Sequence, residues 1–323
     1  MFVLQATGRN WSDRDHCTVP TSMTTSFHSF FKIYGKVFGL LATMTLGALL
    51  PQVHVFSFLV QDLLMVMLFF SFLDMKFSAQ TFKWSVLWVL LANLAVAFLS
   101  YAALIRFGST FALTAFMTAI APTAIAAPVI MGFIHGEIEY VVAAVLITNI
   151  SSAVVIPLAL PFLIGAQIQI SIWEVLQPVF VVMFVPLVLA QLAAYLPAAT
   201  QGFLRRGKRY SFAIWLLNLF LISANASNFL RHENSDSPFS LLIIAIISLV
   251  LCIINFGVGA LLGGPRNWQE ASQSLGQKNL SFVIWIAITF INPLVAMGPT
   301  FYILYHHLYN SWSIYRFEKQ NNG

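Results

Sequence analysis

Apolar runs of about twenty residues recur along nearly the whole chain, and their length constrains the fold more than any other feature. A helix needs about 20 apolar residues to cross a bilayer, whereas a strand of a membrane barrel shows about ten alternating residues. Hydrophobic residues make up 59% of the 323 residues and charged residues only 8%, against roughly 25% charged residues in a soluble domain. The sequence therefore predicts an all-α integral membrane protein in a lipid bilayer, with no nucleic-acid partner.

The breakers between the apolar runs predict ten membrane-spanning helices. Their expected ranges are Phe30–Leu50, Val55–Leu73, Trp84–Ile105, Phe111–Ile134, Tyr140–Leu163, Ile172–Tyr195, Tyr210–Phe229, Phe239–Leu262, Trp268–Ile291 and Leu294–Tyr315. The loops on one side hold only Arg106 and Arg231, whereas those on the other side hold Lys76, Lys83, the cluster Arg205–Arg209, Arg266, Arg316 and Lys319. By the positive-inside rule, we expect both termini in the cytoplasm and the protein in the cell (inner) membrane.

Polar residues, Gly or Pro interrupt two of these spans where a membrane helix is normally most apolar. The fourth span contains Ala121–Pro128 (APTAIAAP), and the ninth contains Gly276–Asn279 (GQKN) about half a chain later. Five spans in each half, an odd number, give the two halves opposite orientations. Interrupted helices at corresponding positions of inverted repeats are typical of the binding site of secondary transporters. We therefore predict two inverted five-helix repeats, each with one interrupted helix, the fourth and the ninth.

Lys278 lies in the second interruption, so we expect its ammonium near the middle of the bilayer. A lysine at the centre of a membrane helix costs about 2.5–3.5 kcal/mol, which makes it a functional candidate. Its charge can replace a bound cation on the carbonyls of the broken helices, release a proton for coupling, or pair with a substrate carboxylate. The structural alternative is a lysine that extends to the interface and has no function.

Other polar residues of the spans are candidates for contact with a substrate or an ion. Thr123, Gln277 and Asn279 either line the cavity at the interruptions or cap the half-helices. Thr148 and Asn149, inside the fifth span, either contact the substrate or ion, or form hydrogen bonds between helices.

Two further candidates lie in the second and seventh spans. Asn225 is expected to contact the substrate or to pack between helices. Asp62 gates the crevice, accepts a proton, or lies in water at the start of its helix. The sequence contains no recognisable nucleophile–base pair, phosphate loop or set of metal ligands, so we expect neither an enzyme nor a cofactor or metal site.

Four segments and the Gly276–Asn279 interruption resemble the bile acid:sodium symporter family, in the bile acid, arsenite and auxin transporter superfamily. The segments are Leu64–Phe77 (LMVMLFFSFLDMKF), Ala121–Leu160, Met183–Gln191 (MFVPLVLAQ) and Asn292–Ser311 (NPLVAMGPTFYILYHHLYNS). Their order and spacing carry the resemblance, which covers nearly all of residues 30–315.

The resemblance implies transport of small organic anions by alternating access between a panel domain and a core domain, in which the interrupted helices four and nine cross. The panel would comprise residues 30–83 and 166–236, and the core residues 84–165 and 237–316, with polar tails at residues 1–29 and 317–323. In sodium-coupled members, ligands for two sodium ions come from the two interruptions and the spans that follow them.

The chain departs from the family pattern where the sodium ligands are expected. Ala127-Pro128 replaces a Ser-Asn pair, Val141 and Val145 replace hydroxyl residues, Ser274 replaces Glu, and Lys278 replaces Gln. Sodium requires oxygen ligands, so we expect a carrier that does not use the family's sodium sites, with Lys278 as internal counter-charge or proton-coupling group. Two alternatives remain: an arsenite-like efflux carrier, although Thr123 stands where that branch has Cys, and a non-transporting membrane sensor with the carrier fold.

Overall fold

The computed structural model describes residues 38–73, 84–165, 172–232 and 238–321, which are helical and contain no β-strand apart from one isolated bridge. After a helical segment at Phe38–Leu49, the elements are η1 Pro51–Phe56, α2 Leu59–Phe72, α3 Trp84–Leu104, η3 Ile105–Phe107, α4 Ser109–Ile120, α5 Ala127–Phe133, α6 Ile138–Ile164, α7 Ile172–Ala193, α8 Ala198–Gly207, η4 Lys208–Tyr210, α9 Ser211–His232, α10 Pro238–Gly276, α11 Leu280–Phe290 and α12 Pro293–Asn321.

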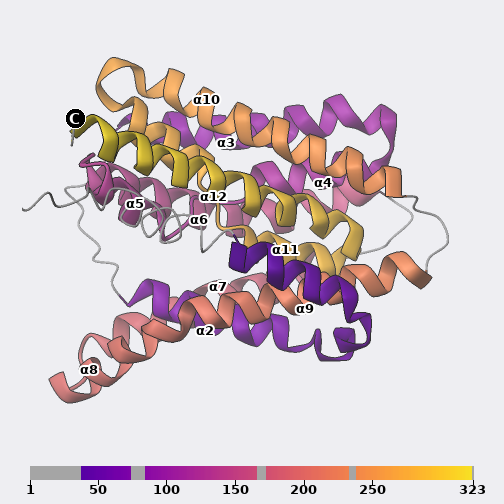
Figure 1. The fold of residues 1–323 in the computed structure, drawn as a ribbon, viewed down its shortest axis with the longest axis horizontal. Helices are drawn as coiled ribbons and strands as arrows, with labels where there is room; N and C mark the ends of the chain where they lie inside the picture. Colours follow the sequence, from indigo (N-terminus) through magenta and orange to yellow (C-terminus); the bar gives the residue numbers. More distant parts are fainter. Residues whose placement is uncertain (1–37, 74–83, 166–171, 233–237, 322–323) are drawn as a thin grey trace, which may run out of the picture.

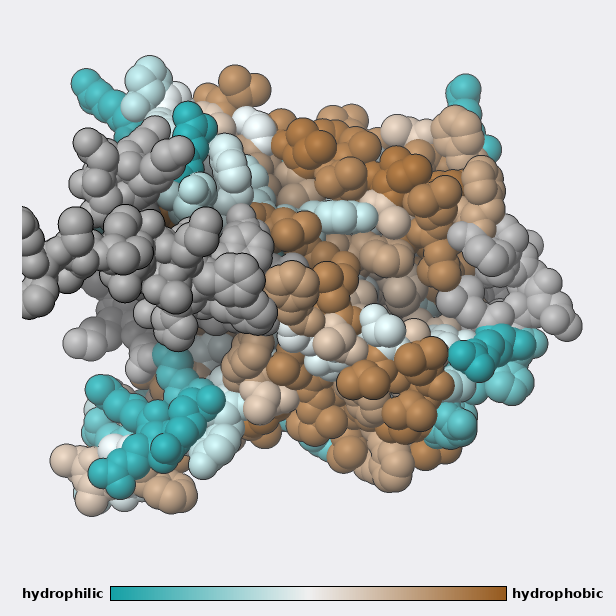
Figure 2. All heavy atoms as spheres, in the orientation of Figure 1, coloured by the Kyte–Doolittle hydropathy of each residue, from teal (hydrophilic) through white to brown (hydrophobic). Residues whose placement is uncertain are grey.

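Within the described residues, five helical stretches are long and apolar enough to cross a membrane. They are Trp84–Phe107, Ile138–Ile164, Ile172–Ala193, Ala198–Phe229 and Phe239–Gly276. Figure 2 shows hydrophobic side chains over the middle of one face and hydrophilic side chains gathered toward its two ends. Large apolar side chains such as Leu99, Ile253 and Phe162 are 65–76% exposed, which suits lipid better than water. The protein is therefore an all-α membrane protein, as predicted.

The helices form two groups in Figure 1. Helices α2, α7, α8 and α9 lie together on one side, and α3, α4, α5, α6, α10, α11 and α12 form the larger group beside them. Contacts of α11 with α2 and of α12 with α9 join the groups, so residues of both can line a site between them.

Both predicted interruptions are present. Helix α4 ends at Ile120, and α5 begins only at Ala127. Pro128 belongs to the first turn of α5 rather than to the interruption, because the first turn tolerates a residue without an N–H. The second interruption separates the end of α10 at Gly276 from the start of α11 at Leu280.

The predicted eighth and ninth spans are joined through a sharp turn inside α10 (Figure 1). Gly264 has φ 57° and ψ −163° there, and Asn267 is also non-helical. Only glycine readily adopts the Gly264 conformation, which lets the chain reverse and bring the second half of α10 back toward the middle of the molecule.

Other boundaries differ from the predicted ones in detail. Helix α8, which ends in the basic cluster Arg205–Arg209, was not predicted, because the apolar pattern marks spans and not short surface helices. Helix α12 continues to Asn321, into the predicted C-terminal tail. The N-terminal tail of residues 1–29, the start of the first span, and Lys76 and Lys83 lie outside the described residues.

Candidate functional site

The two interrupted segments meet and pair with each other. Thr123 and Lys278 form an isolated antiparallel bridge. The N–H of Ala124 donates to the Gln277 carbonyl at 2.8 Å, and the N–H of Asn279 donates to the Pro122 carbonyl at 2.7 Å. Unwound backbone inside a bilayer must find hydrogen-bond partners within the protein. Each interruption supplies partners to the other, and we call the place where the two segments pair the crossing.

The side chain of Lys278 is enclosed at the crossing and is only 2% exposed. Its Nζ donates to Asn93 Oδ1 at 2.5 Å, to the Ala119 carbonyl at 2.8 Å and to the Ala121 carbonyl at 3.1 Å. Ala119 and Ala121 flank the last residue of α4, where carbonyls lack helical partners and the helix dipole is negative. The lysine is therefore buried against a helix end rather than extended to an interface, and all its acceptors are neutral.

Asn93 on α3 completes this cluster and was missed by the sequence analysis. It is 2% exposed, and besides accepting from Lys278 it donates from Nδ2 to the Ile120 carbonyl at 3.2 Å. Ser152 Oγ donates to the same carbonyl at 3.0 Å. A buried amide inside the apolar run Trp84–Ile105 was the available signal, since polar residues in membrane helices are often functional.

The end of α10 meets neutral donors instead of a charge. Thr123 Oγ1 donates to the Ser274 carbonyl at 2.6 Å, and the Tyr302 hydroxyl donates to the Gly276 carbonyl at 2.8 Å. Asn255 Nδ2 in turn donates to the Tyr302 hydroxyl at 3.3 Å. The two helix ends at the crossing are thus satisfied differently. That of α4 receives an ammonium besides the Asn93 amide and the Ser152 hydroxyl, whereas, among the described side chains, that of α10 receives hydroxyls alone.

Thr148 and Asn149 on α6 hold the first interruption in place. Thr148 Oγ1 accepts from the N–H of Thr123 at 2.9 Å, and Asn149 Nδ2 donates to the Thr123 carbonyl at 3.0 Å. Among the described residues, Asn149 Oδ1 has no hydrogen-bond partner. These three predicted residues bind backbone groups, which agrees with the structural alternative given for each of them.

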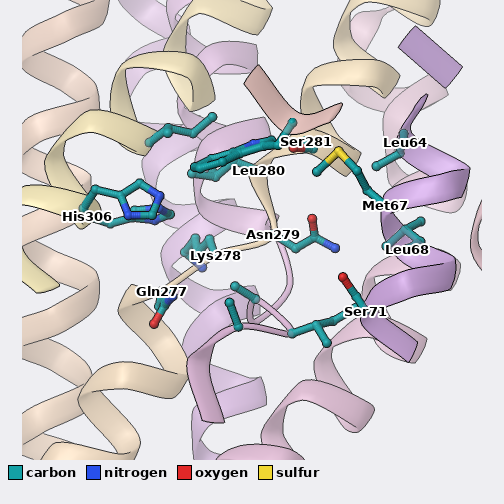
Figure 3. Close-up of a pocket in the computed structure, with 16 residues that line it drawn as sticks. Leu64, Met67, Leu68, Ser71, Gln277, Lys278, Asn279, Leu280, Ser281 and His306 are labelled. Carbon is teal, nitrogen blue, oxygen red and sulfur yellow. The ribbon is translucent and has the colours of Figure 1, made fainter. Parts of the chain in front are cut away.

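A cavity of about 190 Å³ lies beside the crossing, between it and helices α2, α9 and α12 (Figure 3). Figure 3 shows the Asn279 amide directed toward Ser71 on α2. The described lining residues are Leu64, Met67, Leu68, Ser71, Ala124, Ile125, Ala126, Trp215, Gln277, Lys278, Asn279, Leu280, Ser281, Ile303, His306 and His307. None of them is acidic.

The cavity brings together only part of the predicted site. Gln277, Lys278 and Asn279 line it, whereas Thr123, Thr148 and Asn149 lie beside it at the crossing. Asn225 on α9 is partly buried and does not line it, and Asp62 is exposed in the first turn of α2.

His306 and His307 also line the cavity, although the sequence analysis did not place them there. The adjacent histidines in an apolar run were the available signal. His306 is 4% exposed and its Nδ1 has no partner among the described residues, as is true of Gln277 Oε1. Nowhere in the described ranges do three or more His, Cys, Asp or Glu side chains gather in a way that suits a metal ion.

No model of a known protein family matches the chain, and no curated protein matches it. The resemblance drawn from the sequence motifs therefore stays a prediction.

Proposed function

We propose that the protein is a secondary transporter of small organic anions, with Lys278 as a permanent internal cation. The observation that carries the proposal is the enclosed ammonium of Lys278, whose hydrogen-bond acceptors are all neutral. It lies at a cavity whose described lining residues include no Asp or Glu. A buried positive charge whose partners are all neutral favours an anion nearby. An anion about 7 Å away gains about 2 kcal/mol at an effective dielectric constant of about 20.

The start of α11 supports the same substrate class. Leu280 and Ser281 form its first turn and line the cavity. The residue before the helix, Asn279, makes no side-chain capping hydrogen bond to it. A helix begins with unpaired N–H groups and a partial positive charge, which bind carboxylates and phosphates. A substrate carboxylate at this helix start completes its hydrogen bonding.

The contacts of Lys278 favour one of its three predicted roles. Its Nζ contacts three neutral oxygens at the end of α4, and a metal cation bound at the same place would use the same kind of ligand. Direct pairing with a substrate, or loss of a proton, takes donors away from the Ala119 and Ala121 carbonyls. The ammonium therefore replaces a bound sodium ion, and transport is independent of sodium.

The arrangement of the helices supports alternating access. The two interrupted helices occupy corresponding positions of the two halves, as ten spans in two inverted repeats require. Helices α2, α7 and α9 correspond to the expected panel and the remaining long helices to the core, with the cavity between them. A movement of one group against the other exposes the cavity to either side. We therefore also propose that the chain is a member of the bile acid:sodium symporter family and lies in the cell membrane.

Counterflow of a panel of small carboxylates into proteoliposomes tests the proposal. We expect wild-type flux of at least one carboxylate with choline in place of sodium, and a large loss of flux in Lys278→Gln. Arg106→Gln, which removes an exposed cation of η3, is the matched control and keeps its flux. Strict dependence on sodium contradicts the role of Lys278. Binding of carboxylates without flux favours the sensor alternative.

A further inference from the structure

A second cavity, of about 370 Å³, lies in the larger helix group, between the returning half of α10 and the last turns of α12. Figure 1 shows these two segments at the same end of the molecule, with α5 nearby. The described lining residues are Ile134, Trp268, Gln269, Ser272, Gln273, Tyr309, Trp312, Ser313, Arg316 and Phe317. The cavity at the crossing has none of these described lining residues. We call this second cavity the end cavity.

Aromatic rings and one cation dominate its walls. Arg316 is the only charged lining residue among those described, and its guanidinium lies 5.4 Å from the ring centroid of Trp312. This stacking holds the guanidinium beside an apolar surface and leaves its N–H donors for a ligand. Trp268, Tyr309 and Phe317 supply further flat apolar surface. Such walls suit a ligand with a negative group and an apolar, preferably aromatic, body.

Gln273 adds a polar contact that the protein leaves incomplete. The side chain is 2% exposed, and its Nε2 donates to Asn310 Oδ1 at 3.1 Å. Its Oε1 has no partner in the described structure, and neither has Asn310 Nδ2. An unsatisfied buried polar group is costly and calls for a partner. A hydrogen-bond donor on a bound ligand supplies one for Gln273 Oε1.

We propose that the end cavity is a second binding site, separate from the one at the crossing, for an aromatic anion that carries a hydroxyl or amine donor. Arg316 binds the anionic group, the aromatic rings enclose the body, and Gln273 accepts from the donor. Binding at this site does not require the transport proposed above.

Ligand binding here acts on the helix half that ends at the crossing. The N–H of Gln277 donates to the Gln273 carbonyl at 3.0 Å, so Gln273 lies one helical turn before the interruption. A ligand held by Gln273 therefore stiffens the last turns of α10.

The test is calorimetric titration of the full-length protein in zwitterionic-lipid nanodiscs with two probes, 6-hydroxy-2-naphthoate and 2-naphthoate. We expect Arg316→Gln to weaken binding of both probes by about tenfold to a hundredfold, since it removes a charge-assisted hydrogen bond. Gln273→Met removes the acceptor Oε1 and also the hydrogen bond from Nε2 to Asn310, but it keeps Arg316, so it abolishes the preference for the hydroxylated probe. Arg106→Gln is the control and binds like the wild type.

The outcomes separate this proposal from the transport proposal. Unchanged binding of both probes to Arg316→Gln overturns the proposal of a second site. The proposal is also overturned if Asn279→Ala is the only variant that weakens probe binding, because the probes then bind at the crossing. Nanodiscs that contain phosphatidylglycerol test a lipid as the occupant. If this lipid displaces the probes at high salt, the end cavity binds a lipid headgroup and the proposal of a soluble aromatic anion is overturned. If Gln273→Met does not fold, the two Arg316→Gln titrations still decide. Loss of transport in Lys278→Gln has no bearing on this result.

Discussion

Replacing Lys278 with methionine removes a charge and three hydrogen bonds while keeping a side chain of similar length. Asn93 Oδ1 and the carbonyls of Ala119 and Ala121 then lose their common donor in an enclosed site. We expect Lys278→Met to destabilise the protein, although it also removes the cost of burying an ammonium.

The magnitude follows from these two opposing contributions. Each unsatisfied buried acceptor costs about 1–3 kcal/mol, hence about 3–9 kcal/mol for the three. Removing the buried ammonium offsets about 2.5–3.5 kcal/mol of this cost. The central expectation is a net destabilisation of about 3 kcal/mol.

Lys278→Gln behaves differently because its amide supplies a further oxygen. Together with the three acceptors of Lys278, this oxygen forms a set of ligands suited to a hard cation. Sodium at ten times its dissociation constant adds about 1.4 kcal/mol of stability to a protein that binds it only when folded. We expect sodium to raise the melting temperature of Lys278→Gln and to leave that of the wild type unchanged.

Tryptophan fluorescence during heating in nanodiscs measures these changes, with choline replacing sodium at constant ionic strength. Arg106→Gln is again the control and should melt like the wild type in both salts. A wild type that sodium stabilises, or a Lys278→Met protein as stable as the wild type, refutes the idea that the ammonium occupies a cation position.

Three further substitutions test the crossing and its cavity. Thr123→Val removes the donor to a carbonyl of α10 at 2.6 Å and should lower stability by about 1–3 kcal/mol, measured by thermal unfolding. Gly276→Ala places a Cβ 2.3 Å from the ring of Phe256 and should cost about 1–3 kcal/mol, whereas Gly257→Ala, with no atom within 4 Å, serves as the nearly neutral control in the same assay. Asn279→Ala should raise the KM for carboxylate uptake up to about tenfold with little change in melting temperature, because its side chain lines the cavity and makes no capping bond. Equal losses of stability in the two glycine variants, or an unchanged KM, contradict these expectations.

The interruptions could be predicted from the sequence because their causes are local. Proline, glycine and a lysine within apolar runs mark places where a membrane helix cannot continue unaided. The same signals placed Lys278 at the crossing. The acceptors of its hydrogen bonds were not predictable. Asn93 lies 185 residues earlier in the sequence and meets Lys278 only because α3 packs against α4 and α10.

The role of each polar residue was equally hard to predict. The side chains of Thr148 and Asn149 bond to the unwound backbone of Thr123, and the side chain of Thr123 bonds to the last turn of α10. Helical periodicity shows which of these residues share a face of a helix. It does not show whether that face is directed toward the backbone of another helix or toward the cavity. Asn279 and His306 line the cavity instead.

The charges at the crossing have a consequence for the energetics of transport. The C-terminal end of α4 carries a partial charge of about −0.5, which the ammonium of Lys278 offsets. The N-terminal end of α11 then stays available for the substrate.

If the ammonium of Lys278 remains in place throughout the transport cycle, a monovalent anion crosses the membrane as a net negative charge, with no cation accompanying it. Uptake of a monocarboxylate should therefore follow the membrane potential, being faster when the receiving compartment is positive by a potassium diffusion potential set with valinomycin. Uptake that ignores the potential indicates an accompanying proton or cation and removes the argument for a fixed ammonium.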